Sequence, residues 1–250
     1  MTNEKASDIS AAVMATINLA TLSLSSEASG ILSAFSPVIQ NGIQRVLTTI
    51  GPDKLTDREK LRVGASVYWS IKAVEEHRKA GHPTLQDQFD AKTVDALVES
   101  LFRAASEDSQ EQKDQAYGFL LGNFAYQNRF DGGALFTLAK ILKDLTFDEI
   151  LLIASLYGRP AENYEPIYNK FLNNEDLVAG ELVNHFLRLR ELGVTVRTYP
   201  YTTNHTVGSL KLSALGQGLY ELAGLDMLAP EECSHLRDLL DIYTHEQDLL

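Results

Sequence analysis

Two glycines four residues apart, inside a segment that otherwise has the pattern of a helix, constrain this chain most strongly. The segment KDQAYGFLLGNFAYQ, residues 113–127, contains Gly118 and Gly122. Each costs about 1 kcal/mol relative to alanine in a helix interior, so packing must offset roughly 2 kcal/mol. We predict that these glycines line a groove that lets a second helix approach closely, with Phe124 on the same enclosed helix. A broken or frayed helix is the alternative.

Capping signals and apolar spacing predict further helices on both sides of this segment. Thr56 with Glu59, and Thr146 with Glu149, form two capping boxes at helix starts. Apolar residues from Val94 to Ala105 keep the three-four spacing of one buried stripe. Four further helices are expected. The first runs from Thr56 to a stop at Gly81, the second begins at about Ala91, the third includes residues 135–142 and the fourth covers 147–156.

The pattern changes after residue 160. A short helix is expected around 164–172 and a longer one over 177–192, and the runs VTVRTY and VGSLKL then predict a β-hairpin. A helix capped by Ser213 follows, and an amphipathic helix is expected from Pro230 onward, with Cys233, Leu236, Leu240 and Tyr243 on its apolar side. Residues 176–222, with ELVNHFLRLRELGVTVR and LKLSALGQGLYEL, resemble a winged-helix domain.

The first fifty residues are unusually poor in charge. Between Ile9 and Ile50 only Glu27 and Arg45 are charged, but Thr, Ser and Asn interrupt every apolar run that approaches the length of a membrane span. Three interpretations stay open. The segment is a helix in an oligomer interface, a segment that enters a membrane after a trigger, or a buried helix followed by a loop around Pro37.

The composition limits the binding partners and the cellular location that we expect for this protein. The net charge of the 250 residues is -12, and -7 of it lies in residues 213–250, where Arg237 is the one basic residue against eight acidic ones. This balance disfavours broad attachment to nucleic acid or anionic lipid. The single cysteine, Cys233, excludes an intrachain disulfide. The start MTNEKASD lacks the features of a secretory signal, so we expect a cytoplasmic protein.

These observations predict a mainly α fold in which a helical module precedes a winged-helix-like domain with a small β-hairpin. The expected divisions are a charge-poor segment at 1–50, an α-helical module at 51–145, a winged-helix-like domain at 146–225 and an acidic helix at 226–250. The stretch from about Leu55 to Leu156, which contains SQEQKDQAYGFLLGNFAYQ and LAKILKDLTFDEILLIASL, is similar to bacterial helical proteins of the Abi-alpha type. That resemblance implies a setting in abortive infection, the defence of bacteria against phage, and it implies no catalytic residues.

Motifs for catalysis or cofactor binding are not recognised. His77 and His82 are five apart rather than four, and no cysteine pair accompanies the six histidines, so no metal signature is present. Gly118 and Gly122 are not followed by the lysine and hydroxyl residue of a phosphate-binding loop. We therefore expect no enzymatic activity, no cofactor and no metal.

Nucleic acid binding is the main alternative to protein binding. A winged helix that binds DNA places its third helix in the major groove, and the candidate contacts on that helix are His185, Arg188 and Arg190. Its wing, the β-hairpin, contacts the DNA backbone, and the candidates there are Arg197 and Lys211. Residues 181–212 hold four basic and two acidic residues, fewer net charges than a specific DNA-binding surface commonly carries.

The sequence thus favours a non-enzymatic protein-interaction component that oligomerises, in a setting of anti-phage defence. Its partner would be another protein or a second copy of the chain, with the charge-poor N-terminal segment as the self-association element. A winged-helix DNA-binding regulator is the second hypothesis. The third is a membrane-active effector that works through residues 10–50.

Overall fold

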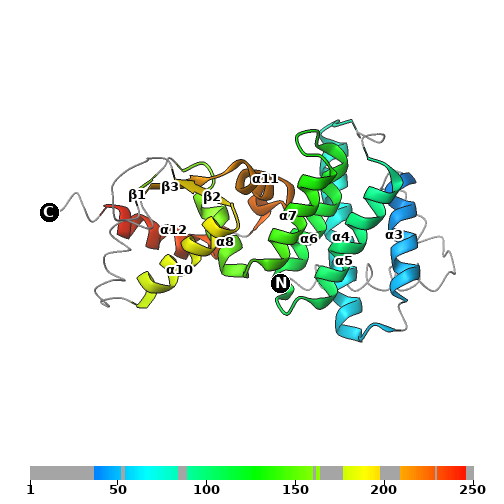
Figure 1. Ribbon diagram of the computed structural model, residues 1–250, viewed down its shortest axis with the longest axis horizontal. Coiled ribbons are helices and arrows are strands. Elements are labelled where there is room, and N and C mark those ends of the chain that lie inside the picture. Colours follow the sequence, from blue (N-terminus) through cyan, green and yellow to red (C-terminus); the bar gives the residue numbers. More distant parts are fainter. Residues whose placement is uncertain are drawn as a thin grey trace. The chain divides into compact units, whose positions relative to one another are not determined.

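The computed structural model describes residues 37–51, 54–83, 89–159, 162–163, 177–197, 209–228 and 230–245. This part of the chain is mainly helical and contains a small antiparallel sheet, which confirms the predicted fold class (Figure 1). The chain divides into two compact units. The first, called here the helical unit, comprises residues 1–144 with 222–224. The second comprises 145–221 with 225–250, and it is called the winged-helix unit only after the resemblance of residues 176–222.

The helical unit is built around α6, which packs against α4, α5 and α7. Its described elements are α3 (Pro37–Ile50), α4 (Asp57–Lys79), α5 (Ala91–Glu107), α6 (Asp114–Asn123), α7 (Gly132–Asp144) and the 3-10 turns η2 (Glu111–Lys113) and η3 (Phe124–Tyr126). The capping box before α4 forms as predicted, because Thr56 N donates to Glu59 Oε2 at 2.6 Å and Glu59 N donates to Thr56 Oγ1 at 3.3 Å.

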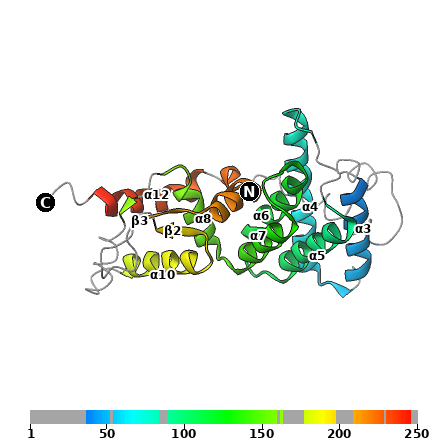
Figure 2. The same cartoon turned by 45° about the horizontal axis from the view of Figure 1, so that its top comes forward.

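Helices α4 and α6 cross at very close range, and they run side by side in both views (Figures 1 and 2). A Cβ atom added at Gly118 would lie 2.5 Å from Trp69 Cβ and would also contact the Ser66 carbonyl oxygen. A Cβ atom at Gly122 would lie 2.5 Å from the Ser70 carbonyl oxygen. The two backbones therefore touch where side chains are missing, and this contact offsets the low helix propensity of glycine.

The crossing predicts the effect of adding one methyl group. Gly118→Ala should lower the free energy of unfolding by a net ~2 kcal/mol. The added carbon meets the backbone of α4, which cannot move aside, so overpacking should cost about 3 kcal/mol, the upper end of the usual range, against a helix-propensity gain of about 1 kcal/mol. Trp69 is the only tryptophan of the chain and lies at this crossing, so its fluorescence in urea reports the helical unit selectively.

Gly133→Ala is the matched control for this substitution. Gly133 lies in α7, and within the described part of the chain a Cβ atom there would meet only Asp131 Oδ1, at the ordinary contact distance of 3.4 Å. Alanine should keep or raise stability at this position, since only helix propensity changes. Equal or greater stability of Gly118→Ala would contradict the close crossing.

Helix α3 accounts for the last part of the charge-poor segment. It begins at Pro37, so residues 37–50 are helical where one of the three interpretations placed a loop. Proline is well suited to the first position of a helix because its missing N–H would have no partner there. Ile43 and Val46 are buried, and α3 packs on α5. Arg45 forms two hydrogen bonds to Asp95, at 2.6 and 2.8 Å. Residues 1–36 lie outside the described part.

The winged-helix unit places a helix directly before a β-hairpin. Its described elements are α8 (Phe147–Leu156), β1 (Glu162–Asn163), α10 (Leu177–Glu191), β2 (Thr195–Arg197), β3 (Ser209–Leu212), α11 (Ala214–Leu222), η4 (Leu225–Met227) and α12 (Pro230–His245). The antiparallel sheet has the order β1-β3-β2, with Val196 opposite Lys211 (Figure 1). The predicted hairpin is confirmed, whereas β1 was not expected.

Local signals set the ends of these elements. Gly193, with φ of 73°, ends α10 in the left-handed conformation that glycine adopts at little cost. Ser213 Oγ accepts a hydrogen bond from Gly216 N at 3.0 Å, which confirms the predicted cap of α11. Cys233 and Leu240 of α12 are buried, and α12 packs on α8. The helix expected around 164–172 and the loop 198–208 lie outside the described residues.

Candidate functional site

Helix α10 carries three of the residues predicted as possible nucleic-acid contacts, which are His185, Arg188 and Arg190. Its inner side is formed by buried apolar residues, which are Ala179, Leu182, Val183, Phe186 and Leu189. Its exposed positions carry both signs of charge, with Glu181, Arg188 and Glu191 all exposed. This face is therefore mixed in charge rather than basic.

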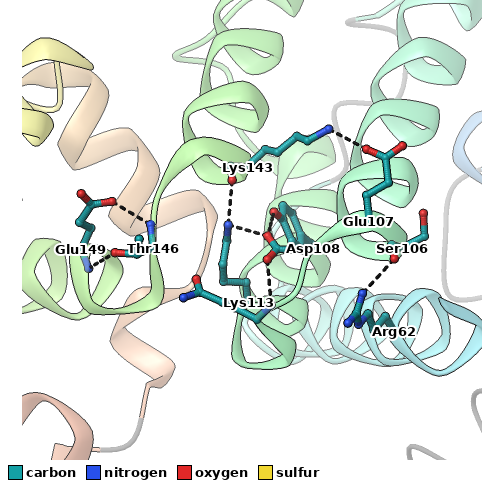
Figure 3. A network of polar contacts seen from close by, with 10 residues as sticks. Arg62, Ser106, Glu107, Asp108, Lys113, Lys143, Thr146 and Glu149 are labelled. Carbon is teal, nitrogen blue, oxygen red and sulfur yellow. Dashed lines mark hydrogen bonds and ion pairs between the residues drawn. The ribbon is translucent and has the colours of Figure 1, made fainter. Parts of the chain in front are cut away.

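A buried carboxylate connects α10 to the start of α8. The Glu149 side chain is only 1% exposed, and its Oε2 accepts a hydrogen bond from Thr146 N at 2.7 Å, which completes the capping box of α8 (Figure 3). Its Oε1 lies 3.4 Å from His185 Nδ1 and 3.3 Å from Arg188 Nε. Glu149 thus serves at once as a helix cap and as the partner of two basic residues.

The electrostatics of this cluster favour its charged form. Burial raises the pKa of Glu149, but the hydrogen bonds from His185 and Thr146 and the charge of Arg188 outweigh burial and hold this pKa below its usual value. The hydrogen bond to Glu149 is also the main reason why the pKa of His185 is raised, against the opposing effect of burial. The imidazolium is therefore favoured beside the carboxylate.

The five residues predicted as possible nucleic-acid contacts fall into different surroundings. His185 and Arg188 come together on Glu149, and Arg190 is half-buried at the end of α10. Lys211 is exposed on β3. Arg197 ends β2, where its backbone pairs with Leu210. Two of the five candidates thus bind an acidic residue of the winged-helix unit itself.

A second cluster of charged side chains lies inside the helical unit, between the end of α5 and the end of α7 (Figure 3). The Lys113 side chain is 1% exposed, and its Nζ lies 2.6 Å from Asp108 Oδ2 and donates to the Lys143 carbonyl oxygen at 2.9 Å. Tyr117 OH donates to the same Asp108 oxygen at 2.7 Å. Burial raises the pKa of Tyr117, so the hydroxyl stays protonated as a donor.

Three further polar atoms of the helical unit are buried without a hydrogen-bond partner among the described residues. They are Arg62 Nε and Ser66 Oγ on α4 and Asp114 Oδ1 at the start of α6. Arg62 has one contact elsewhere, because its Nη1 donates to the Ser106 carbonyl oxygen at 3.0 Å (Figure 3). Burial raises the pKa of Asp114 to about 8, which keeps its carboxyl group largely neutral at pH 7.

Sequence reasoning missed this buried cluster. The segment SQEQKD, which leads into α6 and ends at its first residue, has the polar composition of a solvated lead-in, although Lys113 and Asp114 within it are buried. One signal in the sequence could have indicated it. Lys113 and Tyr117 are four residues apart, so Lys113 lies on the same helix face as an aromatic ring that was expected to be buried.

Comparison with known proteins gives no relative. No protein-family model matches the chain, and neither a curated protein nor a solved structure matches it.

Proposed function

We propose that this chain is a non-enzymatic protein-interaction component whose winged-helix unit binds protein rather than DNA. The observation that supports this most directly is the use of His185 and Arg188 by the buried Glu149. Both basic residues lie where a DNA-reading helix would direct charge to the duplex, and both are engaged by an internal carboxylate. The remaining exposed face of α10 carries Glu181 and Glu191, which repel phosphate.

The proposed partner is a protein, either a second copy of the chain or a separate one, in the cytoplasm. The acidic helix α12 adds a further surface, since Glu232, Asp238 and Asp241 are exposed while Cys233 and Leu240 hold the helix in place. The setting that we propose is bacterial anti-phage defence of the abortive-infection kind. This setting rests on the resemblance of residues 55–156 to the Abi-alpha type alone.

Self-association through the N-terminal segment is tested best by a truncation that leaves α3 intact. A chain that begins at Pro37 keeps Ile43 and Val46 in the core, whereas a chain that begins at Pro52 loses both. We expect light scattering to give a multiple of 27.7 kDa for the full chain and a smaller assembly for the chain from Pro37. The same number of copies above one in both chains would assign oligomerisation to another part of the protein, and a monomeric full chain would contradict self-association.

A DNA-binding regulator is the second candidate. The placement of α10 directly before the hairpin favours it, because it agrees with the resemblance to a winged-helix domain, in which such a helix can enter the major groove. Fluorescence anisotropy of a labelled duplex at low salt separates the two candidates. Protein binding as the function predicts no salt-sensitive rise in anisotropy. A rise that falls with salt and is lost in Lys211→Glu would favour the regulator.

Membrane activity through residues 10–50 is the third candidate. Each of the helices that the structure describes is too short or too polar to traverse a lipid bilayer. Residues 37–50 form α3 within the helical unit, which leaves residues 10–36 as the segment to test. Leakage of dye from anionic vesicles, lost in the chain that begins at Pro37, would support this candidate.

A further inference from the structure

The end of α4 brings two histidines into contact through an irregular turn. After Lys79 the chain turns through Gly81, whose φ is 71°, and His82 N donates to the His77 carbonyl oxygen at 3.0 Å. Gly81 N donates to the Arg78 carbonyl oxygen, also at 3.0 Å. These two bonds form a Schellman motif, which ends the helix and places the rings of His77 and His82 next to each other, with centroids 5.2 Å apart.

A chain of hydrogen bonds fixes the proton on each ring. Asn123 Nδ2 donates to the Leu222 carbonyl oxygen at 2.9 Å, so Asn123 Oδ1 is the acceptor for His77 Nε2, at 3.0 Å. A neutral His77 therefore carries its proton on Nε2 and has a lone pair on Nδ1. This lone pair faces His82 Nδ1 at 2.8 Å, so His82 must supply the one proton between the two nitrogens.

The two rings differ in how firmly they are held. His77 is half-buried, and its ring stacks on Tyr126 with centroids 4.2 Å apart and an angle of 14° between the planes. Its hydrogen bond to Asn123 is retained whether or not Nδ1 carries a proton, because Nε2 is the donor in both forms. His82 is exposed and belongs to the turn. Loss of the contact between the rings would therefore move His82 and the turn, and leave His77 in place.

One proton fits between the two Nδ1 atoms, and two do not. We propose that His77 and His82 form an acid-sensitive latch, which holds the turn at Gly81 closed while His77 is neutral and opens it when His77 takes up a proton. A proton added at His82 Nε2 leaves the bond between the rings intact and strengthens it, because the donor becomes charged. A proton added at His77 Nδ1 places two N–H groups against each other across 2.8 Å, with like charges on the two rings.

The surroundings of His77 favour its neutral form near neutral pH. Burial lowers the pKa of His77, the hydrogen bond to Asn123 opposes this, and the charge of His82 lowers the pKa further. Among the described residues, the groups that face His77 from outside α4 are Asn123, Tyr126 and His82. Of these three, the His82 imidazole is the one that changes charge near neutral pH. The protonation of His77 therefore depends on its partner in the latch.

The direction of the pH dependence follows from these contacts. The pKa of His77 in the folded protein lies below the ordinary value of 6.5 that applies to the unfolded chain. The stability that the closed latch contributes is therefore complete above pH 6.5 and is lost as the pH falls below that value. The adjacent Glu76 of α4 is paired with Lys79 at 2.7 Å, so its charge is balanced. This latch is independent of the protein-binding function proposed above.

An NMR titration of the histidine rings of the full chain, from about pH 8 to about pH 5, tests the latch, because this range includes the ordinary histidine pKa of 6.5. His82→Gln keeps a side-chain donor that never becomes charged. We expect His77, identified by the loss of its signal in His77→Gln, to titrate at a higher pH in His82→Gln than in the unchanged chain. His235→Gln, which changes an exposed histidine on α12, should leave the His77 titration where it is.

Hydrogen exchange of the backbone amides at positions 81 and 82 measures the opening itself, because both donate within the turn. As the pH falls through the titration of His77, these amides should lose protection several-fold in the unchanged chain, after correction for the intrinsic pH dependence of exchange. His82→Gln should keep most of that protection. Protection that does not follow the His77 titration, or a His77 titration that is the same in His82→Gln, would show that the proposal is wrong.

Discussion

Replacing Lys113 with alanine is expected to lower the free energy of unfolding of the helical unit by about 3 to 5 kcal/mol. The substitution leaves the Asp108 carboxylate without its closest cation and the Lys143 carbonyl oxygen without its donor. Both groups lie in surroundings where water cannot replace Lys113 fully, since Asp108 is 9% exposed in its side chain. Urea unfolding monitored by Trp69 fluorescence measures the loss.

Lys143→Ala is the control, because it removes a lysine of the same cluster that faces solvent. Lys143 Nζ lies 2.8 Å from Glu107 Oε2, with side chains 48% and 56% exposed, and such a pair contributes less than about 1 kcal/mol. The carbonyl oxygen that Lys113 needs is retained.

Lys113→Met keeps most of the side-chain volume, so stability equal to the unchanged chain would show that the ion pair contributes nothing net.

Asp114→Asn is expected to act in the opposite direction and to stabilise the protein at neutral pH. The pKa of Asp114 in the folded protein is about 8, against an ordinary value of 3.8. A raised pKa in the folded state contributes stability that is complete below pH 3.8 and is lost progressively as the pH rises to 8. Asparagine does not titrate, so its advantage at pH 7 is on the order of 4 kcal/mol.

The pH dependence identifies the cause. Between pH 4 and 8 the unchanged chain should lose more stability than Asp114→Asn, and the difference between them should grow toward pH 8. Asp57→Asn is the control, since the Asp57 side chain is fully exposed and its loss should change the unfolding free energy by less than about 1 kcal/mol. A parallel pH profile for Asp114→Asn would mean that Asp114 is ionised in the folded protein.

Local and periodic signals predicted much of the fold. The capping boxes at Thr56 and Thr146 and the cap at Ser213 depend only on residues within three positions, and all three form. The crossing at Gly118 was predictable because glycine in an apolar helix has a cost that only packing can offset. Strand β1 was missed because two residues carry no alternating pattern.

Contacts between residues distant in the sequence, and irregular turns, could not be predicted from local or periodic signals. Lys113 is buried by contacts with the end of α7, thirty residues along the chain, and periodicity does not report which polar residue will have such a partner. The row that includes Phe124 was expected to continue as one helix, but α6 ends at Asn123 and Phe124 begins η3. His77 and His82 meet only because the left-handed turn at Gly81 breaks the three-four spacing of a helix.

The double use of Glu149 limits how this unit can change during evolution. Glutamine at that position would still cap α8 but would leave two cations facing a neutral amide. A descendant that turned α10 toward base recognition through residues 185 and 188 would have to release both from their acidic partner. A change of ligand class in this unit would therefore require more than a single substitution, because a change at position 149 alone leaves residues 185 and 188 without their acidic partner.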